Sequence, residues 1–210
     1  FVPYQFPLFQ TAIETLSAHR AFEGKHSSVG ERSMLGVFQE VAIRIANKDI
    51  GQLATFDLMF EGIRAALKSQ IQRSVLNAET QLTNDFAKRV LKALFLVKYI
   101  KGFNATPRNL RVLLQDSFDQ DMNALKKKIE EALNLLDQQT YIQRNGDVYE
   151  YLTDDEKDIE AEIKGTDVDS GDVSAFLGDL LFSDIIRDRK IRFDVTNQDF
   201  PFTKKLDDRI

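Results

Sequence analysis

The sequence predicts a mainly α-helical protein that contains a small winged helix-turn-helix domain. Two observations lead to this fold class. Apolar residues recur at the spacing of amphipathic helices along most of the chain. An Asn-Gly pair then lies between two β-prone runs, directly after the third helix of the middle segment, where a wing would lie. We therefore expect a helical segment over residues 1–81, a winged helix-turn-helix over 82–152, and an acidic helical extension with a terminal strand over 153–210.

Composition indicates a folded protein. With 210 residues, 43% hydrophobic content and 16 Phe, the chain is long enough to bury a sizeable core. No apolar run approaches the roughly 18 residues that a membrane helix requires, and the first residues lack the pattern of a signal peptide. The absence of Cys excludes disulfides and Cys-based zinc sites, and it fits a reducing cytoplasm. We expect a cytoplasmic protein without membrane contact and, since the sequence begins without Met, a piece of a longer chain.

Three helices are expected in the first segment. After the extended, Pro-punctuated "FVPYQFP", apolar spacing predicts a helix over 8–22. Ser28 and Glu31 have the spacing of a capping box and predict the start of a second helix. A third is expected over 56–76, with a break near Ser69. The apolar stripes of all three helices are interpreted as core packing.

The middle segment carries the most informative pattern. A long helix is expected over 83–101, followed by a short one in which Thr106 is the cap and Pro107 takes the first helical position. A third helix over 122–139 places one apolar residue per turn on its inward face: Leu125, Ile129, Leu133 and Leu136.

The hairpin signal follows this third helix at once. Asn145-Gly146 predicts a type I′ turn, because that turn requires positive φ at both central positions. A turn at these residues would pair Arg144 with Asp147 and Ile142 with Tyr149. Three helices with a short second member, followed by a hairpin, describe a winged helix-turn-helix.

The last segment is interpreted as an appendage. Thr153 and Glu156 form another capping box, and Ser170 is expected to cap a further helix. "KIRFDV" is expected to form a strand, and the residues after it to be irregular. The acidic loop "DVDSGD" is not an EF-hand, because Asp172 takes the position that requires Gly, and Gly178 the position that requires Glu. We expect no metal site here.

No enzyme site is expected in this chain. Gly24-Lys25 resembles part of a phosphate-binding loop, but His26 follows where Ser or Thr is required, and His19 takes the place of the first Gly. These two histidines are the only ones in the chain, and they are interpreted as structural or exposed. We therefore predict neither a catalytic residue nor a cofactor bound by this chain alone.

Four blocks of the sequence together resemble a known family. The blocks "FVPYQF", "GKHSSVGERSMLGVFQEVA", "LKALFLVKYIKG" and "DMNALKKKIEEALNLLDQQTYIQRNGDVYEYLT" look like the BrxC family, the P-loop, AAA+-like ATPases of bacteriophage-exclusion (BREX) systems. The resemblance runs over nearly the whole chain but would cover only a part of such a protein, downstream of its ATPase core. Ser27 departs from the family, in which an apolar Leu is expected.

The resemblance implies a role in an ATP-dependent bacterial defence against phage. ATP and Mg²⁺ would be held outside this chain, whose partners would be the nucleotide-binding core of the longer protein, other defence-system proteins and DNA. By analogy with AAA+ lids, residues 1–81 would be lid-like and Arg32 would sense the nucleotide, since an Arg fork suits phosphate oxygens. The alternative is that Arg32 belongs to an ordinary, solvated first helical turn beside Glu31.

Charge argues against strong DNA binding. Residues 82–152 carry 11 basic and 9 acidic side chains, a net charge of +2, whereas residues 153–210 carry 9 and 16, a net charge of −7. Glu130 and Glu131 would face the same polyanion as the nearby lysines, so we expect weak, salt-sensitive DNA contact or protein docking. The candidate DNA- or partner-binding residues are Arg108, Arg111, Lys126, Lys127, Lys128 and Arg144.

Together these features predict a non-catalytic regulatory or interaction part of a defence ATPase. Two alternatives from other classes remain at this stage. One is a free-standing winged-helix transcription regulator that binds DNA, and the other is a pure protein-protein interaction module.

Overall fold

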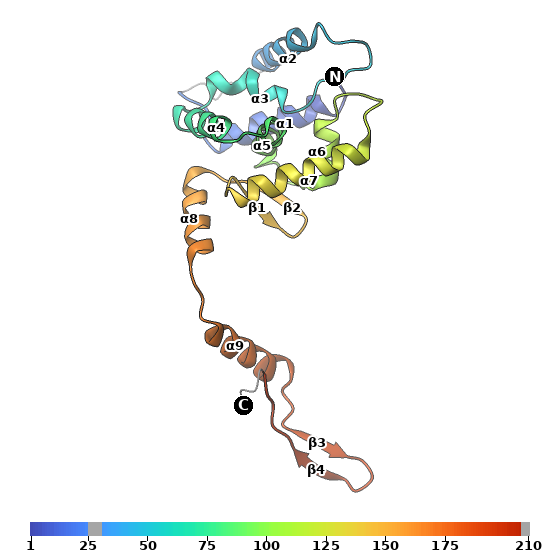
Figure 1. Cartoon of the computed structure of the whole chain (residues 1–210), viewed down its shortest axis with the longest axis vertical. Helices are drawn as coiled ribbons and strands as arrows, with labels where there is room; N and C mark the ends of the chain where they lie inside the picture. The colour runs from blue at the N-terminus through green and yellow to red at the C-terminus, as the bar shows by residue number, and fades with distance from the viewer. Residues whose placement is uncertain (25–30, 207–210) are drawn as a thin grey trace. The chain divides into compact units, whose positions relative to one another are not determined.

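The computed structural model describes residues 1–24 and 31–206, apart from the side chains of residues 31–33. It divides into two compact units, Phe1–Glu162 and Ile163–Ile210. The expectation of a mainly helical protein is confirmed (Figure 1). The finer division at 81/82 and 152/153 falls within the first unit and stays a prediction.

Four α-helices form the first part of the N-terminal unit. They are α1 (Gln5–Ala18), α2 (Glu31–Ile45), α3 (Leu58–Ile63) and α4 (Ser69–Gln81), with a 3-10 turn (Arg64–Ala66) after α3. The predicted break near Ser69 is confirmed, because Leu67 and Lys68 both have extended ψ angles, 153° and 142°. The capping residue predicted for α2, Ser28, lies outside the described residues.

The start of α1 corrects the prediction of an extended N-terminus. The helix begins at Gln5, and Pro7 lies in its first turn, where a backbone N–H has no partner within the helix. The buried Gln5 amide donates to the carbonyl of Ala54 at 2.6 Å and accepts from the backbone N–H of Val2 at 2.9 Å. This contact across 49 residues, which no local pattern reveals, holds the first turn in place.

Helix α5 (Asp85–Val97) lies at the centre of the unit. Its Asn84 cap accepts from the backbone N–H groups of Phe86 and Ala87. It packs against α1 and α3 as well as against the two following helices and the hairpin. Eight of its residues are buried: Ala87, Val90, Leu91, Ala93, Leu94, Phe95, Leu96 and Val97.

Two further helices, α6 (Pro107–Leu114) and α7 (Met122–Gln138), complete the helical part of this unit. Thr106 caps α6 and Pro107 takes its first position, as predicted. Asp121 caps α7 by accepting from two backbone N–H groups. The predicted inward face of α7 is confirmed, since its four apolar residues are at most 1% exposed: Leu125, Ile129, Leu133 and Leu136.

The hairpin of β1 (Ile142–Asn145) and β2 (Val148–Tyr151) follows α7, but its predicted register is wrong. Asn145 pairs with Val148 and Arg144 with Tyr149, so the turn is formed by Gly146 and Asp147. Gly146 has φ +61°, and neither Asn145 nor Asp147 has positive φ. Positive φ at the first central position alone is the pattern of a type II′ turn, which requires only one Gly.

The remaining elements are α8 (Asp154–Gly165), α9 (Ser170–Asp179), a π-helical turn (Leu180–Ile185), β3 (Lys190–Phe193) and β4 (Gln198–Pro201). The capping box of α8 is confirmed, because Thr153 N–H donates to Glu156 at 2.7 Å and Glu156 N–H donates back at 3.4 Å. Asp169 rather than Ser170 caps α9. The strand in "KIRFDV" is confirmed, whereas β4 lies where irregular chain was expected. None of the described helices is long and apolar enough to cross a bilayer.

Candidate functional site

The outward face of α7 is fixed by the burial of its inward face against α5 and α6. Lys126, Lys127 and Lys128 are exposed, as the helical period requires. Glu130 and Glu131 are exposed one turn further along, and Lys126 Nζ lies 3.7 Å from a Glu130 carboxylate oxygen. The helix therefore presents a surface of mixed charge rather than a basic stripe.

The hairpin beside α7 uses its Arg within its own structure. Arg144 Nε donates to the carbonyl of Gly146 at 2.8 Å, and its guanidinium lies over the Tyr149 ring, 5.7 Å from the centroid. This arrangement replaces the ion pair with Asp147 that the predicted register implied. Arg144 is exposed, but part of its hydrogen-bonding capacity is already engaged at the turn.

The loop between α6 and α7 adds an apolar element that sequence reasoning missed. Phe118 is 71% exposed there, and its N–H donates to the carbonyl of Gly51 at 3.3 Å. On α6, Arg108 is exposed and Arg111 is half-buried, while Val112 is 49% exposed. The candidate residues on α6 and α7 are thus interspersed with acidic and apolar groups.

The nucleotide-sensing hypothesis concerns the first turn of α2. Arg32 belongs to this helix, but its side chain is outside the description, so its role stays a prediction. Among the side chains of residues 1–24 and 34–206, no three acidic or His groups are placed to hold a metal ion.

A pocket of about 210 Å³ lies where α1, α4, α5 and the start of α8 meet. His19 and Tyr99 stack on one wall, with ring centroids 3.8 Å apart and planes 6° apart. Arg20 and Lys68 bring positive charge to the lining, and Asp155 brings negative charge. Because the volume is below the roughly 300 Å³ of typical ligand sites and the charges are mixed, we interpret the pocket as a packing junction.

A buried cation next to this pocket joins three elements. Lys98, at the end of α5, has a side chain only 1% exposed, and its Nζ donates to the carbonyl of Tyr151 at 2.6 Å. The same Nζ lies 3.2 Å from Glu150 and 2.8 Å from Glu156. Burial raises the pKa of Tyr151 to about 12, although a hydrogen bond with Ser74 acts in the opposite direction. These contacts hold β2 and the first turn of α8 against α5.

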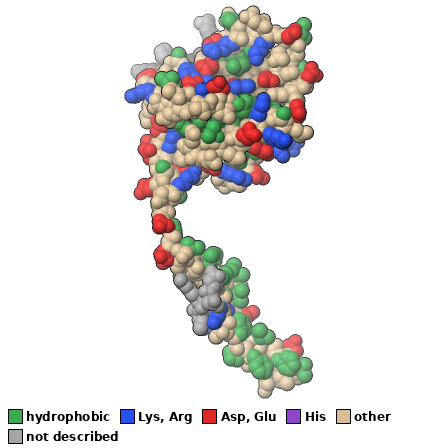
Figure 2. All heavy atoms as spheres, in the orientation of Figure 1, with side chains coloured by type: hydrophobic (Ala, Val, Ile, Leu, Met, Phe, Trp, Pro, Cys, Tyr) green, Lys and Arg blue, Asp and Glu red, His purple; other side chains and the backbone are tan. Residues whose placement is uncertain are grey.

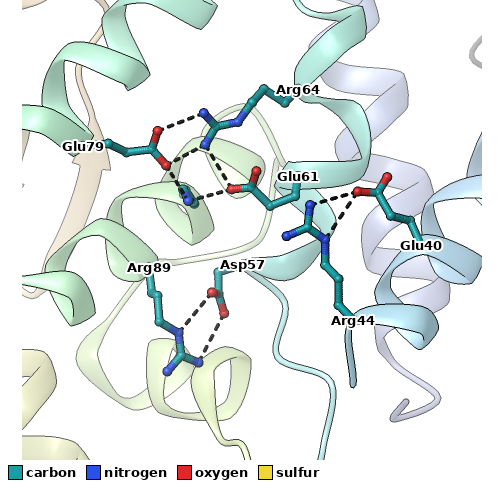
Figure 3. A network of polar contacts seen from close by, with 8 residues as sticks. Glu40, Arg44, Asp57, Glu61, Arg64, Glu79 and Arg89 are labelled. Atoms are coloured by element: carbon teal, nitrogen blue, oxygen red, sulfur yellow. Dashed lines mark hydrogen bonds and ion pairs between the residues drawn. The ribbon is translucent and has the colours of Figure 1, made fainter. Parts of the chain in front are cut away.

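A second ionic cluster joins α3, α4 and α5 (Figure 3). Arg64 donates to Glu79 at 2.5 Å and to Glu61 at 3.0 Å, and Lys92 Nζ lies 2.6 Å from both carboxylates. The hydrogen bond from Arg64 is the main reason why the pKa of Glu79 falls to about 2. Burial raises the pKa of Glu61, but contacts with Lys92 and Arg64 outweigh it and lower that pKa overall. The cluster is a structural tie, since its charged groups pair with one another.

The C-terminal residues of the chain match a protein family. Residues 166–210 match the family described as the fourth domain of the BREX ATP-binding protein BrxC, a domain with a six-stranded beta sheet. No solved structure matches the chain. The matched residues lie outside the four blocks that carry the sequence resemblance, so the two observations are independent. Together they support the assignment of this chain as a fragment of a BrxC protein.

Proposed function

We propose that this chain is a non-catalytic regulatory and interaction part of a AAA+-like ATPase that acts in bacterial antiphage defence. The observation that carries the proposal is the family match over residues 166–210, because it connects the chain with an ATP-binding BREX protein. The sequence has no phosphate-binding loop, so ATP and Mg²⁺ would be held by the core of the longer protein. Its first partner would then be that core.

The order of elements supports a winged helix-turn-helix within this part. Helices α5, α6 and α7 occur in succession, the second of them is short, and the hairpin β1–β2 follows directly (Figure 1). In winged helices that bind DNA, the third helix enters the major groove. Here that helix is α7, whose outward residues decide between DNA and protein as the partner.

The chemistry of this surface favours protein. Glu130 and Glu131 would be repelled by phosphate groups, and Lys126 is already paired with Glu130. Phe118 is an exposed aromatic side chain of the kind that is enriched at protein interfaces. We infer that α7 and the loop before it contact the nucleotide-binding core or another defence-system protein, and that DNA contact is weak.

A titration with labelled duplex DNA at near-physiological salt tests this choice. We expect non-specific binding only, with a Kd weaker than about 1 μM that weakens further as salt is added. Lys126→Glu with Lys127→Glu should reduce binding no more than the matched double change Lys48→Glu with Lys101→Glu, at exposed positions outside α7. Submicromolar, salt-resistant binding lost only in the α7 variant would instead support a DNA-binding regulator.

The protein arm of the experiment uses the separately purified nucleotide-binding core. The Lys126 and Lys127 double variant should weaken binding of the chain to the core, and the Lys48 and Lys101 variant should not. Equal binding of both variants and of the unchanged chain would remove α7 from the interface.

A further inference from the structure

The β3–β4 hairpin of the C-terminal unit is amphipathic. Its register pairs Ile191 with Phe200 and Arg192 with Asp199. Because side chains alternate along a strand and directly opposed residues share a face, Phe193 joins Ile191 and Phe200 on one apolar face, of which Gln198, opposite Phe193, is the polar member. The other face carries the charged residues of the hairpin, Lys190, Arg192 and Asp199.

The apolar face is uncovered. Ile191, Phe193 and Phe200 are each more than half exposed, and apolar side chains gather over this unit in Figure 2. No residue described in the unit is buried. A two-stranded hairpin is marginally stable by itself, and a sheet becomes stable when further strands or a helix cover its apolar face. The exposed apolar face thus lacks the strands or helix that would bury it.

The hydrogen-bond pattern between β3 and β4 shows which backbone groups point outward at each free edge of the hairpin. Phe202 N–H donates to the opposed carbonyl of Arg189 at 3.3 Å, which makes these two residues a hydrogen-bonded pair. Such pairs alternate along an antiparallel ladder, so the backbone groups of the next pair, Lys190 and Pro201, point away from the partner strand. Pro201 has no N–H, and the outer edge of β4 therefore lacks a donor there.

The outer edge of β3, in contrast, has both a hydrogen-bond donor and an acceptor at each outward-pointing residue. The same alternation directs the N–H and carbonyl groups of Lys190 and Arg192 outward from β3. Proline within sheets is largely confined to edge strands, with its nitrogen on the unpaired side. The backbone thus favours β3 over β4 as the strand that accepts a neighbour.

We propose that β4 is an edge strand of the six-stranded sheet for which the matched family is described, and that the sheet continues beside β3. The occupant of the β3 edge is a further strand of that sheet. Two strands lie among the described residues of the matched segment, so the sheet needs others. The inference shares the family match with the function proposed above but does not require that function, so the experiment below can fail without affecting it.

Residue-resolved amide hydrogen exchange tests the proposal in this chain and in a longer chain that carries the complete matched domain. The amides of Lys190 and Arg192 should exchange at least about tenfold more slowly in the complete domain, because a neighbouring strand protects them. The Asp199 amide, which points outward from β4, is the matched control and should exchange at the same rate in both chains.

Proline substitutions provide a second, independent arm. Arg192→Pro and Asp199→Pro both remove an outward N–H and leave the hydrogen bonds between β3 and β4 intact. Arg192→Pro should lower the melting temperature of the complete domain clearly more than Asp199→Pro does.

Three results would overturn the proposal. Protection of Asp199 without Lys190 and Arg192 would place the next strand beside β4. Equal exchange of all three amides in both chains would leave both edges open. If the β3 amides are already protected from exchange in the shorter chain, and this protection is lost on dilution, a second copy of the chain rather than a further strand of the domain occupies the β3 edge.

Discussion

Arg89 Nε lies 3.1 Å from a carboxylate oxygen of Asp57, whose side chain is only 4% exposed (Figure 3). The same guanidinium donates to the Thr55 hydroxyl at 3.1 Å. Arg89 belongs to α5 and Asp57 lies directly before α3, so the pair attaches the segment before α3 to the central helix.

Removal of this guanidinium should destabilise the chain strongly. Arg89→Met keeps an unbranched, apolar side chain but leaves the Asp57 carboxylate buried without its cation, and we expect a loss of about 3 kcal/mol in the free energy of unfolding. Arg44→Met is the matched control, because Arg44 and Glu40 form an ion pair that is nearly half exposed. It should cost less than about 1 kcal/mol. Equal losses in urea titrations would contradict the role assigned to Asp57.

Acid should weaken the ionic cluster at Glu79. The pKa of Glu79 is about 2 in the folded chain and lies below its ordinary value of 4.5. A depressed pKa stabilises the fold above the unfolded value, so this contribution is complete above about pH 4.5 and is lost as the pH falls toward 2. Glu79→Gln should flatten the pH dependence of the unfolding free energy in this window, measured by denaturant titration at several pH values.

Arg64→Met gives an independent measurement on the same cluster. It removes the largest cause of the low Glu79 pKa, so it should flatten the same pH window while leaving the carboxylate in place. If both variants keep the acid dependence of the unchanged chain, the cluster does not contribute to it.

Two glycines should respond in opposite directions to the same substitution. Gly146 has φ +61°, and an Ala there should destabilise the hairpin by about 1 kcal/mol. Gly36 lies in α2 with open space around it, and Gly36→Ala should stabilise by about 0.5–1 kcal/mol through helix propensity. Thermal unfolding of both variants checks the signs, and stabilisation by Gly146→Ala would contradict the turn described for the hairpin.

The nucleotide-sensing hypothesis predicts a kinetic effect only in the longer protein. The isolated chain should hydrolyse no ATP above background, because it lacks a phosphate-binding loop. In a protein that includes the nucleotide-binding core, Arg32→Ala should lower turnover and leave the circular dichroism spectrum unchanged. Arg44→Ala, near the end of the same helix, is the control. Unchanged turnover in the Arg32 variant would assign it to a solvated first helical turn.

Local chemistry explains which elements could be predicted from the sequence. Thr106 with Pro107, and Thr153 with Glu156, act within one helical turn, so the starts of α6 and α8 are readable from adjacent residues. The inward face of α7 follows from its period. By contrast, β4 contains Asp199 and Pro201, which disfavour strands, and it forms because β3 offers a pairing partner.

The polar contacts of the core could not be predicted in the same way. Lys98 and Glu156 are 58 residues apart, and Arg89 and Asp57 are 32 apart. Charged residues at such separations are too numerous for a sequence pattern to select the pairs. The outward position of Lys126, Lys127 and Lys128 was predictable because it depends on one helix, whereas the exposed Phe118 depends on a bridge between two loops.

The central position of α5 has a mechanical consequence. This helix packs against α1 and α3 as well as against α6, α7 and β2, and ion pairs of Arg89 in its second turn and of Lys98 at its C-cap attach it to other segments. A force that a partner exerts on α7 would therefore reach α1 and α3 through their shared contacts with α5. Load on the outward surface of α7 would be carried by helices that lie before residue 81 in the chain.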